Sequence, residues 1–148
     1  IQKAVLPGIE QLQEHSYIFS SVITSDSLAG SKAWSLIMTN VYNRDRDPEK
    51  KLFPLVKPDD NGLASNGEDT IFIKGIALKK VERRDGSMAS FPIKMLGGYE
   101  LSTTEGVVAI VDIIDKNIWF YNELGPRDKL LISTIATAIF ARRVKTGW

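Results

Sequence analysis

The residue types that most often carry out chemistry are few in this chain, and their spacing is poor for catalysis. His15 is the single histidine, and a general base needs a partner and a tuned pKa. Asp112 and Asp115 flank two isoleucines, and side chains three residues apart on a strand point to opposite faces, so these carboxylates make poor co-ligands. For Asp115 the pattern favours a turn. The chain has no cysteine, which excludes disulfides, cysteine-based zinc sites and a thiol nucleophile.

Three short motifs resemble ligand-binding loops only in part. Asp45-x-Asp47 and Asp59-Asp60-Asn61-Gly62 are faintly similar to calcium loops, but neither is followed by the glutamate that closes an EF-hand, and this favours solvated loops. Gly97-Gly98 lacks the spacing and the following helix of a phosphate-binding loop, so we expect a bulge or a turn there. We therefore predict a protein that is not an enzyme and uses no cofactor, metal ion or small-molecule substrate. A small enzyme of unfamiliar type is the third option, after the two classes given below.

The positive charges of the chain gather in its second half. The net charge is +1, but residues 1–69 hold 7 Lys/Arg against 10 Asp/Glu, whereas residues 70–148 hold 12 against 8. Six cations come from adjacent predicted strands and three from the last turn of the predicted final helix, namely Lys74, Lys79, Lys80, Arg83, Arg84 and Lys94, and Arg142, Arg143 and Lys145. One interpretation is a solvated sheet edge and a helix end whose dipole favours cations. The other is a face that binds phosphates, on which each cation near an anionic membrane contributes about 1 kcal/mol.

Hydrophobic periodicity predicts one α+β domain over residues 15–148, with a twisted antiparallel sheet and two helices packed on it, preceded by an extended arm over 1–14. Alternating aromatic and β-branched residues in HSYIFSSVITS (15–25) predict a strand. Apolar residues recur at spacings of three and four from Ala33 to Val41, which predicts a helix over 31–42 that carries Trp34. The remaining expectations are an edge strand at 51–57, strands at 70–83, 99–104, 107–114 and 118–121, and an amphipathic helix at 127–145.

The stretch VKPDDNGLASNGEDT (56–70) is the most polar and turn-rich run in the chain, yet Leu63 and Ala64 lie in its middle. Its composition predicts a loop. A leucine at the tip of such a loop has two interpretations: it contacts another molecule, or it folds back and covers the edge of its own core.

The order of these elements resembles the matrix proteins of non-segmented negative-strand RNA viruses, the rhabdovirus type in particular, with the bornavirus type as a cousin. The corresponding segments are HSYIFSSVITS, SKAWSLIMTNVY, KKLFPLVKP, DDNGLASNGED, GGYELSTTEGVVAIVDIID and DKLLISTIATAIFARR. The resemblance covers most of the chain and consists in the order of the elements and the residue composition of the segments. It implies that Leu63 and Ala64 form a contact tip and that Ala4, Val5, Leu6 and Pro7 form a second strap on the next subunit. The lysine-rich tail with a budding motif that is usual in the family is missing, and we expect a segment upstream of Ile1.

The resemblance and the charge pattern together lead to a functional hypothesis. We expect a non-enzymatic structural protein that self-associates, as a homo-oligomer or an open array, and bridges the anionic inner leaflet of a membrane and the viral nucleoprotein or RNA during budding. It would lie in the virion beneath the envelope, and in the host cytoplasm at the inner membrane face. The alternative is a small bacterial α+β binding module, such as an immunity protein or a secretion-system subunit, that holds one partner and ignores lipid.

Overall fold

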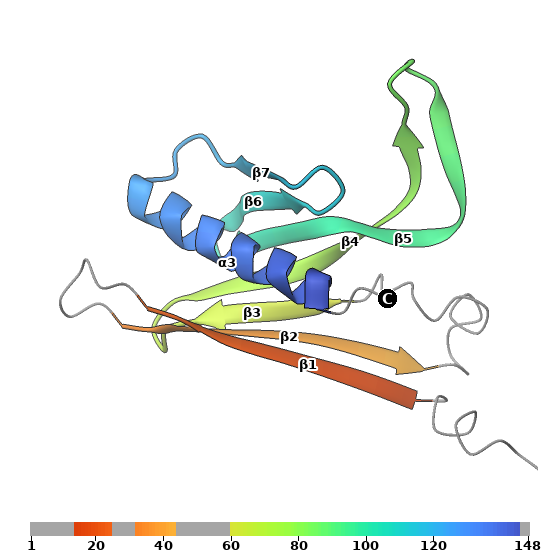
Figure 1. The fold of residues 1–148 in the computed structure, drawn as a ribbon. Coiled ribbons are helices and arrows are strands. Elements are labelled where there is room, and N and C mark those ends of the chain that lie inside the picture. Colours follow the sequence, from red (N-terminus) through yellow and green to blue (C-terminus); the bar gives the residue numbers. More distant parts are fainter. Residues whose placement is uncertain (1–13, 25–31, 44–59, 146–148) are drawn as a thin grey trace, which may run out of the picture.

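The computed structural model describes residues 14–24, 32–43 and 60–145. Within them, seven strands form one antiparallel sheet, and one helix packs on it (Figure 1). The elements are β1 (Glu14–Ile23), β2 (Trp34–Asn43), β3 (Asn61–Ser65), β4 (Thr70–Glu82), β5 (Met88–Thr103), β6 (Gly106–Asp112), β7 (Asn117–Phe120) and α3 (Pro126–Lys145). The expected α+β class, with an antiparallel sheet and a C-terminal helix, is therefore confirmed.

The sheet is a meander, because each strand pairs with the next one along the chain, from β1 to β7. Short turns join the consecutive strands from β3 to β7. Gly106 ends the β5–β6 turn with a φ of 139°, and Lys116 lies in the β6–β7 turn with a φ of 58°, both in the left-handed region that tight turns use. The sequence predicted both of these turns at these positions.

The helix α3 lies on one face of the sheet and closes the core. Ile132, Ile135 and Ile139 recur at spacings of three and four and are buried in one cluster with Leu36 and Tyr99 of the sheet. The helix has 20 residues and is therefore about 30 Å long. That length lets it approach both edge strands, β1 and β7, so that one helix covers the sheet from edge to edge.

The predicted helix over 31–42 is wrong, because residues 34–43 form the strand β2. Leu36 and Met38 point into the core at a period of two, while Ile37 between them lies on the opposite face and is exposed. Apolar residues on both faces of a strand imitate the three-and-four spacing of a helix. Residues 34–43 pair with β1 on one side and β3 on the other, and this pairing stabilises the strand over the helix.

The predicted loop over 56–70 is wrong for residues 61–65 and is confirmed for residues 66–69, which form the turn between β3 and β4. Residues 61–65 form β3, an inner strand between β2 and β4. Gly62 permits this close pairing, since a Cβ at this position would lie 2.2 Å from the carbonyl oxygen of Ile37. The edge strand expected at 51–57 and the N-terminal arm lie outside the described residues.

The long hairpin of β4 and β5 changes register twice. Ile76 pairs with Gly98 and Ala77 with Leu96, which leaves Gly97 as an extra residue on β5, so the bulge expected at Gly97-Gly98 is confirmed. Further out, four residues of β5 (91–94) face only Lys79 of β4. Such irregularities bend a strand, and beyond them the hairpin departs from the plane of the sheet (Figure 1). We call its outer part, residues 79–90, the distal arm.

Gly97 and Gly98 offer a matched test of this geometry. A Cβ at Gly98 would lie 2.3 Å from the carbonyl oxygen of Val111, whereas one at Gly97 would lie 2.0 Å from the Cδ1 atom of Leu78. A side-chain end can rotate away and a paired backbone cannot. We expect Gly98→Ala to lower the free energy of unfolding by roughly 1–3 kcal/mol and Gly97→Ala to lower it less, as measured by urea unfolding. A loss for Gly98→Ala no larger than that for Gly97→Ala would show that the paired backbone of β6 yields as readily as the Leu78 side chain.

Candidate functional site

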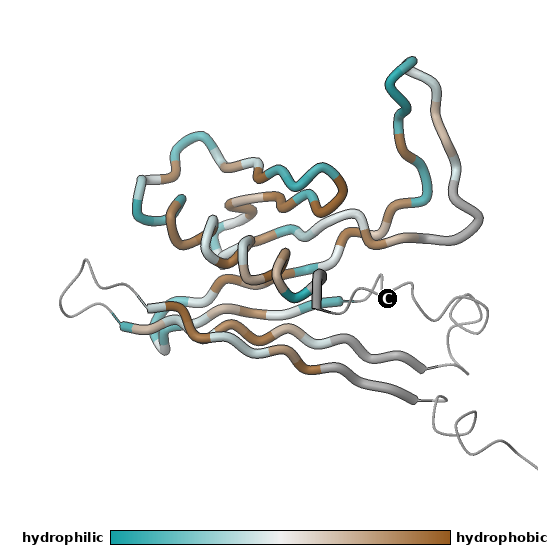
Figure 2. The backbone as a smooth tube through the Cα atoms, viewed as in Figure 1, coloured by the Kyte–Doolittle hydropathy of each residue, from teal (hydrophilic) through white to brown (hydrophobic). Residues whose placement is uncertain are grey.

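Four of the predicted cations gather on the distal arm. Lys79 and Lys80 lie near the end of β4, Arg83 and Arg84 follow in the turn, and all four are exposed. No ion pair joins any of them to a residue that the structure describes. We call these four residues the basic tip, and Figure 2 shows the end of this hairpin as hydrophilic. Two acidic residues, Glu82 and Asp85, lie among these cations in the sequence.

The turn of the distal arm is held by hydrogen bonds of its own. The Arg83 N–H donates to the Ser87 carbonyl oxygen at 2.7 Å, and the Gly86 N–H donates to the Arg83 carbonyl oxygen at 2.9 Å. The side chain and backbone N–H of Ser87 donate to the Asp85 carboxylate, and these bonds lower the pKa of Asp85 below its ordinary value. The Asp85 carboxylate is thus bound within the turn, and these hydrogen bonds fix the backbone conformation that carries Arg83 and Arg84.

The apolar side chain of Met88 stands beside these charges. Met88 pairs with Glu82 at the base of the turn, and 58% of its surface is exposed. Met88 is therefore an exposed apolar side chain near the basic tip, with the acid Glu82 as its cross-strand neighbour.

Two of the other predicted cations have described side chains, Lys74 and Arg142, and neither joins the basic tip. Lys74 is exposed on the main part of the sheet, where it pairs with Glu100 of β5. The side chains of Lys94, Arg143 and Lys145 lie outside the described part of the structure. Arg142 is described, and its assignment to an anion-binding surface is wrong, because only 6% of the residue is exposed.

Arg142 instead forms a buried ion pair with Asp60, which precedes β3 and is 2% exposed. The two nitrogens Nη1 and Nη2 of Arg142 bind the two carboxylate oxygens, the Nη2–Oδ1 distance being 2.9 Å. The Tyr99 hydroxyl donates a third hydrogen bond to the same carboxylate. Burial alone would lower the pKa of Arg142, but the hydrogen bond and charge of Asp60 outweigh it and raise the pKa. This cluster fastens the end of α3 to the sheet.

The sheet face opposite α3 carries an unusual number of exposed apolar side chains. Register places Ile37, Leu63 and Phe72 side by side across β2, β3 and β4. We call the whole group the open face; it consists of Ile18, Val22, Ile37, Leu63, Phe72, Val107 and Trp119, with exposed fractions from 39% for Leu63 to 75% for Ile18. Exposed apolar side chains that adjoin one another, as Ile37, Leu63 and Phe72 do, mark interaction sites in soluble proteins.

The open face changes the interpretation of the two residues that were expected to form a contact tip. Leu63 is exposed, but at the centre of a sheet and not at the end of a loop. Ala64 points to the other side and is fully buried, so its predicted role in self-association is wrong. The arm residues Ala4, Val5, Leu6 and Pro7 lie outside the described residues. The open face as a whole was not predicted from the sequence. Its signal was that β2 has apolar residues at both odd and even positions, and so on both of its faces.

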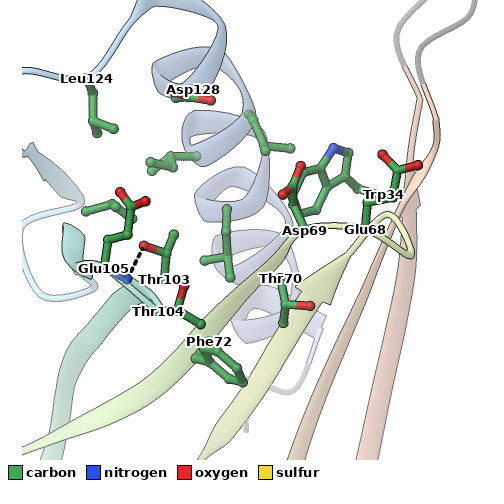
Figure 3. Close-up of a pocket in the computed structure, with 14 residues that line it drawn as sticks. Trp34, Glu68, Asp69, Thr70, Phe72, Thr103, Thr104, Glu105, Leu124 and Asp128 are labelled. Carbon is green, nitrogen blue, oxygen red and sulfur yellow. Dashed lines mark hydrogen bonds between the residues drawn. The ribbon is translucent and has the colours of Figure 1, made fainter.

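A hollow of about 560 Å³ opens where α3 begins, between the β3–β4 and β5–β6 turns. Figure 3 shows Asp128 on the helix at one side, Glu105 and Thr103 at another, and Trp34 beside Asp69 at a third. Every charged residue in its lining is acidic, and the others include Ile71, Val108, Leu124, Leu131 and Ile132. One of the acids, Glu68, already pairs with Lys32. We call this hollow the acidic cleft.

The described residues hold no group of three or more histidine, aspartate or glutamate side chains that is arranged to bind a metal ion. No helix among them is both long and apolar enough to cross a membrane. The side chain of His15 lies outside the described part, and Asp112 acts in a turn, accepting hydrogen bonds from the N–H groups of Ile114 and Asp115. Asp115 lies in the turn, as expected, and the Asp112 carboxylate helps to hold that turn.

Comparison of the chain with protein-family models, with curated proteins and with solved structures finds no match.

Proposed function

We propose that this chain is a non-enzymatic structural protein that self-associates and binds anionic membrane surfaces through the basic tip. The observation that carries the proposal is the distal arm, where four exposed cations and an exposed methionine lie at the bent end of a long hairpin. The open face supports self-association, because it offers apolar surface that a solitary molecule leaves in water.

The mechanism is additive. Each cation near an anionic surface contributes about 1 kcal/mol and the effect decays within a Debye length, so one copy binds weakly and reversibly. Self-association places several basic tips on one object, and binding of the first tip raises the effective concentration of the others. Avidity therefore supplies the strength that a single tip lacks.

A viral matrix role, with assembly beneath an envelope and a bridge to nucleoprotein or RNA, is the biological setting that we propose for this mechanism. Its support is the chemistry of the basic tip and the open face. The order of elements supports it less, because the segments SKAWSLIMTNVY and DDNGLASNGED contain strands β2 and β3 where the resemblance implies a helix and a loop.

The acidic cleft favours a second candidate function. A binding module of the immunity-protein or secretion-subunit type that captures a basic segment of one partner would use such a cleft, with Trp34 available for a cation–π contact. A module of this kind forms a stoichiometric complex and does not bind lipid.

Vesicle co-sedimentation of the unmodified protein separates the two functions. We expect binding to vesicles that contain phosphatidylserine, little binding to phosphatidylcholine vesicles, and a steep loss of binding between low and physiological salt, because exposed charges are screened. Equal binding to both vesicle types, or none at low salt, would refute the membrane proposal. Binding to single-stranded RNA with no binding to either vesicle would assign the tip to nucleic acid instead.

A further inference from the structure

We infer that the open face is the interface of a two-fold symmetric dimer, in which two copies pack sheet against sheet and leave α3 on the two outer sides. The inference deepens the self-association part of the proposed function and rests on it, but it does not depend on membrane binding. It commits to a second copy of this chain as the occupant of the face.

The area of the open face is sufficient for such a dimer. Strands about 4.8 Å apart spread the seven strands over about 29 Å, and side chains of one face repeat about every 6.8 Å along a strand. With three rows of side chains, the footprint is roughly 600 Å² per copy and 1,200 Å² in total, above the ~1,000 Å² expected of a specific interface. Smaller contacts of the crystal-packing type would not need seven apolar side chains.

The charges on the open face favour a second copy over other partners. The row next to Leu63 carries Lys74 and Glu100, which face each other across β4 and β5, and the row that contains Ile37, Leu63 and Phe72 has no charge. An anionic lipid or nucleic acid surface would need an excess of cations here, and a basic partner would need an excess of acids. These two rows, which hold all of the open face except Val22, together carry one charge of each sign, and such a surface is complementary to itself when rotated by a two-fold axis.

The symmetry also follows from the position of the apolar centre. In an isologous contact, if one residue of the first copy meets a second residue of the other copy, the reverse contact is also made. The uncharged row with Leu63 can therefore cross the two-fold axis, while Lys74 of each copy approaches Glu100 of the other. Two sheets in this arrangement stack about 10 Å apart with strand directions within about 30° of each other. Such a dimer is closed, which differs from the open array expected from the sequence, and it carries two basic tips.

The test is the assembly state of the protein in solution. We expect the unmodified chain to sediment as a dimer at micromolar concentration and its thermal midpoint to rise with concentration. Leu63→Asp should raise the dimer dissociation constant by at least about a hundredfold, because each dimer would bury two unpaired carboxylates. Leu130→Asp is the matched control: Leu130 is 64% exposed on α3, outside the open face, and this variant should stay dimeric.

A second variant guards against a folding defect. Trp119→Ser removes a 64% exposed ring at the border of the open face and should weaken the dimer with an unchanged circular dichroism spectrum. A wild-type chain that stays monomeric at every concentration, as it would if another segment of the same chain covered the face, overturns the inference. So does a Leu63→Asp protein that remains a full dimer. Leu63→Asp leaves the basic tip intact. If this variant is a monomer that still binds phosphatidylserine vesicles weakly, the dimer interface is confirmed and the membrane proposal is supported independently of it.

Discussion

Exchange of all four residues of the basic tip for glutamate (Lys79→Glu, Lys80→Glu, Arg83→Glu and Arg84→Glu) is expected to lower the affinity for phosphatidylserine vesicles by roughly a thousandfold or more. At about 1 kcal/mol for each cation near the membrane, the four charges contribute about 4 kcal/mol, and 1.4 kcal/mol corresponds to a factor of ten. Reversal adds repulsion to this loss. Co-sedimentation at low salt measures the change.

The matched control moves the same kind of charge elsewhere on the molecule. Arg127 and Lys129 are exposed near the start of α3, and Lys116 is exposed in the β6–β7 turn. Their joint exchange for glutamate changes the net charge by six units, against eight for the basic tip, and we expect it to lower vesicle affinity much less. If both sets of changes lower binding in proportion to net charge, the membrane responds to the whole protein and the basic tip has no special role.

Folding should be unaffected by the changes at the basic tip, and this makes the experiment interpretable. The four side chains are exposed and have no ion pair with any residue in the described ranges, and substitutions at such positions shift stability by about 0.5 kcal/mol or less each. The turn itself depends on Asp85, Gly86 and Ser87, which remain. Urea unfolding of the variant should therefore resemble that of the parent protein.

The elements that the sequence predicted correctly are those whose causes are local. The β5–β6 and β6–β7 turns follow from Gly106 and from the run 115–117, and α3 follows from a proline at its start and a regular apolar stripe. Each of these signals lies within a few residues of the structure it produces. The same is true of the basic tip, since a run of charged residues around a turn has to be exposed.

The elements that the sequence did not reveal have distant causes. The strand β3 contains one buried side chain, Ala64, and no β-branched residue, so its own composition favours a loop. It is a strand because β2 and β4 supply partners on both sides. The strand β2 shows a helical pattern because it is apolar on two faces, and the second face is the open face. The feature on which the proposed self-association rests is thus the one that disturbed the secondary-structure prediction.

The role of Arg142 was hidden for the same reason, because its partner Asp60 lies 82 residues earlier. From sequence, an arginine in the last turn of a helix is explained by the helix dipole and by solvent. The structure places it in a buried pair with two further consequences: the cation is unavailable to membranes, and its loss should affect folding.

Arg142→Met is therefore expected to lower the free energy of unfolding by about 3–5 kcal/mol, because it leaves the Asp60 carboxylate buried without its cation. The double variant Asp60→Asn with Arg142→Met should recover most of this loss, since the asparagine oxygen still accepts the hydrogen bond from Tyr99 and no buried charge remains. Arg127→Met, at an exposed position of the same helix, should change the free energy by about 0.5 kcal/mol or less. Urea unfolding at neutral pH compares the three variants.

A loss below about 1 kcal/mol for Arg142→Met would show that Asp60 finds other partners, and the end of α3 would then be held by its apolar residues alone. Vesicle binding by the folded fraction of Arg142→Met should equal that of the parent protein, because a buried guanidinium cannot contact lipid headgroups.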